Sequence, residues 1–217
     1  MRSEQQPTYI VVEGPIGVGK TSLARRLAES LDGELLLERA EENPFLERFY
    51  QNPREAALPA QLFFLFQRAR QLQDLRQEDL FRPVRVADFL MEKDRLFARL
   101  NLDDQEYRLY EQAWSHLTLD APVPDLVIYL QAPVEVLRRR VARRGVHYER
   151  HIDPGYLERL AESYARFFHY YDAAPLLIVN AADIDLVDSE ADYQALLERV
   201  RGTRHGRHYF NPLPVSL

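Results

Sequence analysis

The amino-acid sequence predicts a single α/β domain over residues 1–217, in which a five-stranded parallel sheet carries helices on both faces. Two observations support this fold class. Short apolar runs bounded by turn residues recur along the chain, as expected for buried strands. Segments with apolar residues at helical spacing separate these runs, and such alternation is typical of a covered parallel sheet. No repeat, low-complexity tract or Gly/Ser-rich linker divides the chain.

The strands are expected where β-branched and other apolar residues cluster. The first is Thr8–Glu13, which leads into a glycine turn. Four further runs have the same character: Glu34–Glu38, Pro83–Asp88, Asp125–Leu130 and Pro175–Asn180. Ligands of open parallel sheets bind beyond the carboxyl ends of the strands. We therefore expect Glu13, Glu38 and Asp88 to lie together at that edge.

Helical periodicity fills the segments between the strands. A first helix is expected at Lys20–Leu31, directly after the glycine turn. Longer helices are expected at Leu58–Asp79, Asp103–Leu117, Pro133–Arg144, Pro154–Asp172 and Ser189–Arg201. Residues 202–217 show no clear period, and we expect an irregular tail there.

Composition excludes several classes of function. Hydrophobic residues make up 46% of the chain, but the apolar runs are too short to cross a membrane. The net charge of −6 argues against binding to nucleic acid through phosphate neutralisation. Cysteine is absent and the amino terminus has no apolar leader, so we expect a cytoplasmic protein without disulfides.

The strongest motif follows the first strand. The run Gly14-Pro15-Ile16-Gly17-Val18-Gly19-Lys20-Thr21 matches GxxxxGK[ST] at every fixed position. The glycines of such a loop let backbone N–H groups point at phosphate oxygens, and the following helix adds its positive end. Lys20 would contact the β- and γ-phosphates of ATP, and the Thr21 hydroxyl would bind Mg²⁺. Because the only other lysine is Lys93, a chance lysine in this motif is improbable.

The glycine loop alone does not separate kinases from GTPases and motor ATPases. No DxxG or NKxD motif stands in a suitable place, and the strand that ends in Asp88 lacks the Asp-Glu pair of mechanical ATPases. Arg140 and Arg144 lie four residues apart on one face of a predicted helix. They would close over the transferring phosphoryl group as a lid at about residues 138–150, or form a solvated basic face.

Several blocks of the chain, taken in order, resemble the deoxyribonucleoside kinase family, and within it the bacterial deoxyadenosine/deoxyguanosine kinase branch. The blocks are EGPIGVGKTSLA, LLLERAEENPFLERFYQNP, QLFFLFQRARQL, VRVADF with EKDRLFA, and PDLVIYLQAPVEVLRRRVARRG. They cover most of residues 9–180. The resemblance implies a P-loop kinase fold with an arginine-rich lid, and a homodimer. It also implies transfer of the γ-phosphate from ATP, with Mg²⁺, to the 5′-hydroxyl of a deoxynucleoside, in this branch a purine one.

The resemblance implies roles for individual residues. Glu38 is expected to be the general base that takes the proton from the 5′-hydroxyl, which suits a carboxylate at the sheet edge. Tyr50 and Glu149 are expected to bind the 3′-hydroxyl of the sugar, and Asp88 to bind Mg²⁺ beside Thr21. Three residues are expected to read the base edge: Gln61, Arg68 and, if one residue is deleted nearby, Asp94. This set could read the O6/N7 or N1 edge of a purine, or cytosine.

Two departures from the family pattern bear on these roles. The family commonly has an Asp/Glu-Arg-Ser motif after the third strand, whereas this chain has Asp88-Phe89-Leu90. An arginine that would orient the phosphates is therefore missing. The lid lacks a further arginine at Val146-His147, so phosphate clamping would depend on Arg140 and Arg144, or on Arg143 in a shifted register.

Two alternatives stay open. A nucleoside monophosphate kinase, such as a thymidylate kinase, shares the loop and the lid but needs more cations around its acceptor than Arg68. A nucleotide-sensing module without the chemistry is compatible with the missing arginine. The adenine of ATP is expected against the backbone of Asn180–Leu186, and the apolar faces of Leu58–Asp79 and Asp103–Leu117 are compatible with a dimer.

Overall fold

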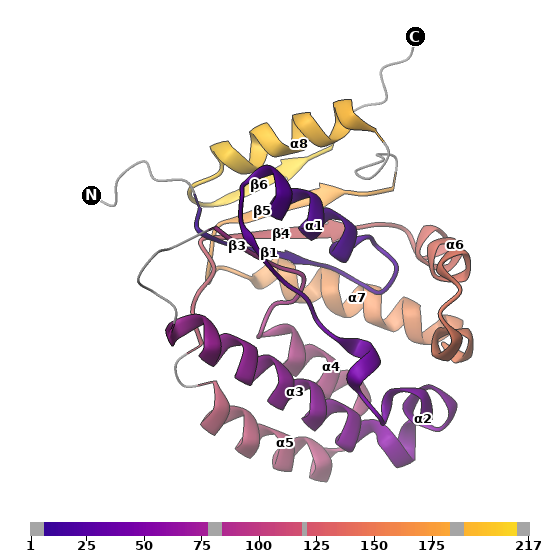
Figure 1. Ribbon diagram of the computed structural model, residues 1–217. Helices are drawn as coiled ribbons and strands as arrows, with labels where there is room; N and C mark the ends of the chain where they lie inside the picture. Colours follow the sequence, from indigo (N-terminus) through magenta and orange to yellow (C-terminus); the bar gives the residue numbers. More distant parts are fainter. Residues whose placement is uncertain (1–6, 78–83, 119–120, 183–188, 212–217) are drawn as a thin grey trace.

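A parallel sheet runs through the middle of the computed structural model, which describes residues 7–77, 84–118, 121–182 and 189–211 (Figure 1). Within these residues the sheet has six strands in the order β2-β3-β1-β4-β5-β6. The strands are β1 (Tyr9–Glu13), β2 (Glu34–Leu36), β3 (Arg85–Ala87), β4 (Leu126–Gln131), β5 (Leu176–Asn180) and β6 (Arg207–Phe210). All neighbouring strands pair in parallel, and β1 at the centre pairs with both β3 and β4.

The predicted fold class is confirmed, but the number of strands was wrong. We expected five strands and an irregular tail from residue 202, whereas Arg207–Phe210 forms β6 and pairs with β5. Its side chains are alternately exposed and half-buried, as expected at a sheet edge. The Arg207 side chain also donates to the carbonyls of Phe168, His169 and Tyr171. Backbone pairing and these side-chain bonds hold the strand, and neither leaves an apolar pattern in the sequence.

Helices cover both faces of the sheet. They are α1 (Lys20–Ser30), α2 (Leu46–Gln51), α3 (Pro53–Gln77), α4 (Lys93–Asn101), α5 (Asp104–Leu117), α6 (Val134–Arg144), α7 (Pro154–Tyr170) and α8 (Glu190–Gly202). Alternate residues of β1 face opposite sides. Ile10 and Val12 pack in the core beneath α1 and α8, while Val11 packs in the core that α3, α4, α5 and α7 cover. Figure 1 shows these two layers above and below the sheet.

Two short helices were not predicted, and one long helix begins earlier than expected. The helices α2 and α4 have six and nine residues, too few for a clear period. The helix α3 begins at Pro53 and not at Leu58, and it contains Pro59. Proline is favoured at the first position of a helix, where its missing N–H leaves no hydrogen bond unmade. Pro53 occupies that first position in the structure.

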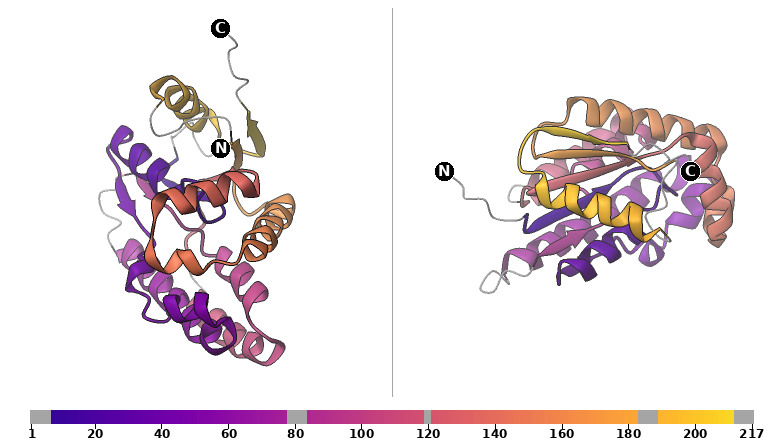
Figure 2. Two further views of the ribbon diagram at one scale, coloured as in Figure 1. Left: turned by 90° about the vertical axis from the view of Figure 1, so that its right-hand side faces the viewer. Right: turned by 90° about the horizontal axis from the view of Figure 1, so that it is seen from above.

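The lid lies beyond the carboxyl ends of the strands. The helix α6 and the 3₁₀ segment His147–His151 form one end of the molecule in both Figure 1 and Figure 2. The glycine loop after β1 and the segments after β2 and β3 meet at the same end. Among the described helices, none has the length and apolar character that crossing a membrane requires.

Candidate functional site

The glycine loop joins β1 to α1 in the arrangement that phosphate binding requires. Gly14, Gly17 and Gly19 have φ values of 151°, 83° and 109°, which disfavour other residues. A Cβ atom on Gly14 would lie 2.4 Å from the carbonyl oxygen of Leu130, so the turn also leaves no room for a side chain at this position. Lys20 begins α1, and its Nζ lies 2.8 Å from the Gly14 carbonyl oxygen. The loop therefore forms a cradle of backbone groups with its lysine folded over it.

A threonine and an aspartate meet beside this cradle. The Thr21 hydroxyl donates to Asp88 Oδ2 at 2.5 Å, and the backbone N–H of Glu38 donates to Asp88 Oδ1 at 2.7 Å. Thr21 comes from α1 and Asp88 from the end of β3. A hydroxyl and a carboxylate are hard oxygen ligands, which suit Mg²⁺ that keeps most of its other contacts to water and phosphates. Among the described residues no cluster of three acidic or histidine side chains could hold a metal alone.

The Glu38 carboxylate is held by two buried cations. Arg68 on α3 donates to Oε1, and Lys93 on α4 donates to Oε2 at 2.9 Å. Only 3% of the Arg68 and Lys93 side chains is exposed, against 17% of the Glu38 side chain. Burial acts to raise the pKa of Glu38, but the charges of Arg68 and Lys93 outweigh it and hold the pKa well below its ordinary value. Glu38 is therefore ionised and fixed at both oxygens.

A fully buried carboxylate ties the glycine loop to the segment after β3. Glu13 accepts from the backbone N–H of Gly14 at 2.9 Å and from that of Leu90 at 2.7 Å. The Tyr164 hydroxyl on α7 also donates to it at 2.9 Å. These bonds fix the phosphate loop relative to the end of β3. Glu13 was expected at this edge of the sheet, and the structure places it there as a fastening group beneath the site.

The predicted base-reading residues form one buried cluster. Asp94 accepts from Arg68, from the Tyr110 hydroxyl at 2.7 Å and from Gln61 Nε2 at 2.8 Å. Gln61 Nε2 also lies 3.1 Å from the Asp94 carbonyl oxygen. Because both partners are acceptors, the amide nitrogen of Gln61 must point at Asp94. Gln61 and Arg68 line the cavity described below, whereas Asp94 lies behind them.

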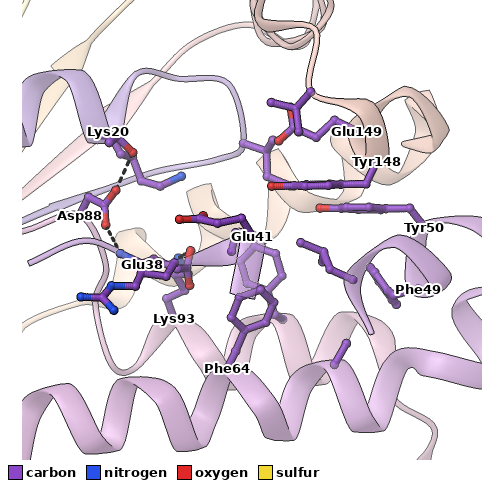
Figure 3. Close-up of a pocket in the computed structure, with 18 of the residues that line it drawn as sticks. Lys20, Glu38, Glu41, Phe49, Tyr50, Phe64, Asp88, Lys93, Tyr148 and Glu149 are labelled. Carbon is purple, nitrogen blue, oxygen red and sulfur yellow. Dashed lines mark hydrogen bonds and ion pairs between the residues drawn. The ribbon is translucent and has the colours of Figure 1, made fainter. Parts of the chain in front are cut away.

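The lid contributes a second group of side chains. The ring of Tyr148 stacks on that of Tyr50, with centroids 6.2 Å apart and planes inclined by 6° (Figure 3). Arg144 pairs with Glu149, and its Nε donates to Glu149 Oε2 at 3.1 Å. Burial raises the pKa of Tyr50, so its hydroxyl remains a neutral donor. The expected sugar-binding pair, Tyr50 and Glu149, thus lies at the lid end of the site, opposite Glu38 and Asp88.

The two predicted clamping arginines diverge in the structure. Arg144 lines the cavity, but Arg140 donates to the carbonyl oxygens of Val18 at 3.1 Å and Ala181 at 2.8 Å. Arg140 therefore bridges the glycine loop and the segment after β5. That segment carries the expected adenine contacts, of which residues 183–186 lie outside the described part of the chain.

These groups surround one cavity of about 440 Å³. Its lining includes most of the predicted site residues: Gly17, Lys20, Thr21, Glu38, Tyr50, Gln61, Arg68, Asp88, Arg144 and Glu149. Figure 3 shows Glu38, Asp88 and Lys93 at one end of this cavity, and Tyr50, Tyr148 and Glu149 at the other. A cavity of this size, lined by charged groups at both ends and by aromatic rings, fits a small organic molecule.

The lining also contains residues that sequence reasoning missed. Lys93 stands in the charged run Glu92-Lys93-Asp94-Arg95, which resembles a solvated helix face, and only the rarity of lysine could have signalled it. Tyr148 and Tyr156 line the cavity as well. Aromatic residues are frequent in this chain, so nothing in the sequence separated these two from core residues.

Comparisons with known proteins agree with the geometry. The sequence model of the family described as "Deoxynucleoside kinase" matches residues 10–204. A deoxyguanosine kinase from Bacillus subtilis is 33% identical over 199 residues, which cover 89% of this chain and 96% of that protein. A deoxyadenosine kinase from Lactobacillus acidophilus is 28% identical, with coverages of 88% and 94%. A solved deoxyadenosine kinase from M. mycoides with bound dATP has a TM-score of 0.76 and 24% identity, and covers 89% of this chain and 99% of its own.

Proposed function

This chain belongs to the deoxynucleoside kinase family, and on that premise we propose that it transfers the γ-phosphate of ATP to the 5′-hydroxyl of a purine deoxynucleoside. Kinase activity towards a deoxynucleoside follows from the family. The base preference, the metal ion and the residue roles are the proposal. The observation that carries them is the common cavity, which holds the glycine loop, the Thr21–Asp88 pair and the Glu38 carboxylate.

The donor half of the site would hold ATP and Mg²⁺. Backbone N–H groups of the glycine loop and Lys20 would bind the phosphates, as their geometry favours. Thr21 and Asp88 would hold Mg²⁺, which when bound neutralises charge on the phosphate oxygens. Arg144 would contact the transferring phosphoryl group from the lid. Arg140 would act on the donor side indirectly, through the carbonyls that it bridges.

The acceptor half would orient a nucleoside with its 5′-hydroxyl at Glu38. The ionised Glu38 carboxylate would accept the hydroxyl proton as the oxygen–phosphorus bond forms. Tyr50 and Glu149 would bind the 3′-hydroxyl at the lid end of the cavity. Because Asp94 fixes the amide nitrogen of Gln61, the Gln61 oxygen would accept a hydrogen bond from the base.

A purine base is supported by the relatives. Similar proteins from Bacillus subtilis and Lactobacillus acidophilus are named deoxyguanosine and deoxyadenosine kinases, and a further one from Bacillus subtilis is named a deoxyadenosine/deoxycytidine kinase. Guanine and adenine each offer an N–H donor for Gln61 and an acceptor for Arg68, which lies two helical turns further along α3. The hydrogen-bonding groups therefore fit both purines.

We also propose a homodimer in the cytoplasm. Phe66 on α3 is 54% exposed and Leu109 on α5 is 52% exposed, and these neighbouring helices would supply the contact between subunits. The absence of cysteine supports a reducing compartment. Analytical ultracentrifugation at micromolar concentration should show a dimer for the wild type and a monomer for Phe66→Asp. A monomeric wild type would contradict the proposal.

The proposal is tested with a panel of acceptors. The purified protein, ATP and Mg²⁺ are incubated with each of the four deoxynucleosides and with deoxyguanosine and thymidine 5′-monophosphates. We expect the highest kcat/KM with deoxyguanosine or deoxyadenosine. Phosphorylation of the monophosphates alone would identify a nucleoside monophosphate kinase, and ATP binding without any product would identify a sensing module.

A further inference from the structure

Lys93 is a buried cation whose charge is directed at the reacting end of the cavity. Only 2% of its surface is exposed. Its Nζ lies 2.9 Å from Glu38 Oε2 and 3.9 Å from Glu13 Oε1. Lysine is almost never fully buried unless its charge is paired. The chain has one other lysine, Lys20, and both line the same cavity.

From this geometry we propose that Lys93 is a positioning residue for phosphoryl transfer, which fixes the Glu38 carboxylate towards the acceptor hydroxyl. The inference rests on the proposed role of Glu38 as general base. It assigns to Lys93 a function that the family resemblance did not give to this residue.

Lys93 restricts the orientation of the Glu38 carboxylate. Arg68 holds Oε1 of Glu38 and Lys93 holds Oε2, so each carboxylate oxygen has its own cation. With one cation removed, the carboxylate could turn about its last torsion, which is soft. Arg68 cannot hold both oxygens, because its other terminal nitrogen is bonded to Asp94. Lys93 is therefore required for a single orientation of the base.

The place of Lys93 in the chain fits this role. The residue after Asp88 is Phe89, which is fully buried in the core and brings no charge to the site. The chain then turns, and the backbone N–H of Lys93 donates to the Leu90 carbonyl at 3.2 Å as α4 begins. The ammonium group lies 5.7 Å from the centre of the Phe97 ring, a distance at which a cation is attracted to an aromatic face. The start of α4 thus delivers a fixed positive charge to the site.

Two cations touch the Glu38 carboxylate, and Lys93 is one of them. The charged groups around Glu38 are Arg68 on α3, Lys93 on α4, Lys20 on α1, Asp88 after β3 and Glu13 on β1. Only Arg68 and Lys93 donate to its side-chain oxygens. Removing Lys93 therefore leaves Oε2 without its partner, and the acceptor hydroxyl would meet a carboxylate with no fixed orientation.

The test compares Lys93→Met with Lys93→Arg and with a control on the same helix, Arg95→Met. Arg95 is half exposed and pairs with Glu111 outside the cavity. The kcat and the nucleoside KM are measured with ATP, Mg²⁺ and a deoxynucleoside that the wild type accepts. For Lys93→Met we expect kcat to fall about 100-fold with the nucleoside KM nearly unchanged.

The inference is supported if Lys93→Met loses kcat without a change in KM, Lys93→Arg recovers most of the lost kcat, and Arg95→Met behaves as the wild type. A folded Lys93→Met enzyme with the wild-type kcat would reduce Lys93 to a packing role. If Lys93→Met does not fold, Lys93→Gln decides by the same comparison, because it keeps a polar side chain but is shorter and carries no charge. A wild type that phosphorylates no deoxynucleoside would instead refute the proposed function.

Discussion

Replacing Glu38 with glutamine separates the chemistry of this site from its stability. The substitution keeps the size of the side chain and one acceptor oxygen, but it removes the negative charge between Arg68 and Lys93. The backbone N–H of Glu38, which binds Asp88, is not altered. ATP binding should therefore persist, while the group that would accept the hydroxyl proton is lost.

The expected effect of Glu38→Gln on stability depends on the ion pairs that Arg68 and Lys93 retain in the variant. Breaking a buried ion pair by removing one partner costs about 3–5 kcal/mol. Here Arg68 keeps Asp94, Lys93 keeps Glu13 at 3.9 Å, and the Glu38 side chain is 17% exposed. We therefore expect a smaller loss of about 2 kcal/mol, close to that of one hydrogen bond to a charged group. In a chain of this length the loss corresponds to a decrease in Tm of about 4–8 °C.

The stability difference should depend on pH in a defined direction. The pKa of Glu38 is lower in the folded protein than its ordinary value. The contribution of the ionised Glu38 side chain to the free energy of unfolding is therefore complete above the ordinary glutamate pKa of about 4.3. This contribution is lost as the pH falls below that value. The Tm difference between wild type and Glu38→Gln should be largest near pH 7 and should shrink below about pH 4. Differential scanning calorimetry across this range measures it.

The kcat of the Glu38→Gln variant tests the assignment of Glu38 as general base more directly than its stability does. Loss of a general base reduces kcat by a factor of about 10²–10⁴. Calorimetric titration should show that the affinity for ATP changes less than about threefold, since the Glu38 side chain bonds to no residue of the glycine loop. A folded Glu38→Gln enzyme with near-normal kcat would refute the assignment of Glu38 as base.

Three further changes probe other parts of the cavity. Gly14→Ala places a Cβ 2.4 Å from a backbone oxygen, and we expect it to lower the Tm and to abolish ATP binding, measured by thermal shift and calorimetry. Asp88→Asn should lower kcat about 100-fold and raise the Mg²⁺ concentration for half-maximal rate, and an unchanged metal dependence would exclude Asp88 as a ligand. Tyr50→Phe should raise the KM for the deoxynucleoside about tenfold and leave the KM for ATP unchanged, and its effect should be absent with a 3′-deoxy analogue.

Much of the fold could be predicted because its signals are local. The glycine run 14–21 between a strand and a helix predicted the loop geometry, and the parallel arrangement predicted that Glu38 and Asp88 share an edge with it. Arg207–Phe210 was missed because an edge strand held by backbone bonds and by an arginine leaves no apolar pattern. The strands in the interior of the sheet could thus be predicted from the sequence, whereas the edge strand β6 could not.

The site was only partly predictable because side-chain partners are set by tertiary contacts. Arg140 and Arg144 share a helical face, yet Arg140 bonds to the carbonyls of Val18 and Ala181 while Arg144 pairs with Glu149 in the cavity. Spacing along a helix could not predict that these two arginines have different partners. Lys93 likewise gave no local sign of burial, because its partners come from β1 and from the segment after β2.

The central claim is that an ionised carboxylate at the sheet edge activates the 5′-hydroxyl of a deoxynucleoside for attack on ATP. The most direct measurement is the product that the purified protein forms from ATP, Mg²⁺ and deoxyguanosine or deoxyadenosine, followed by ³¹P NMR. We expect one 5′-monophosphate for each ATP converted to ADP, with this signal lost in Glu38→Gln. No 5′-monophosphate from either purine deoxynucleoside, or the same rate in Glu38→Gln, would contradict it.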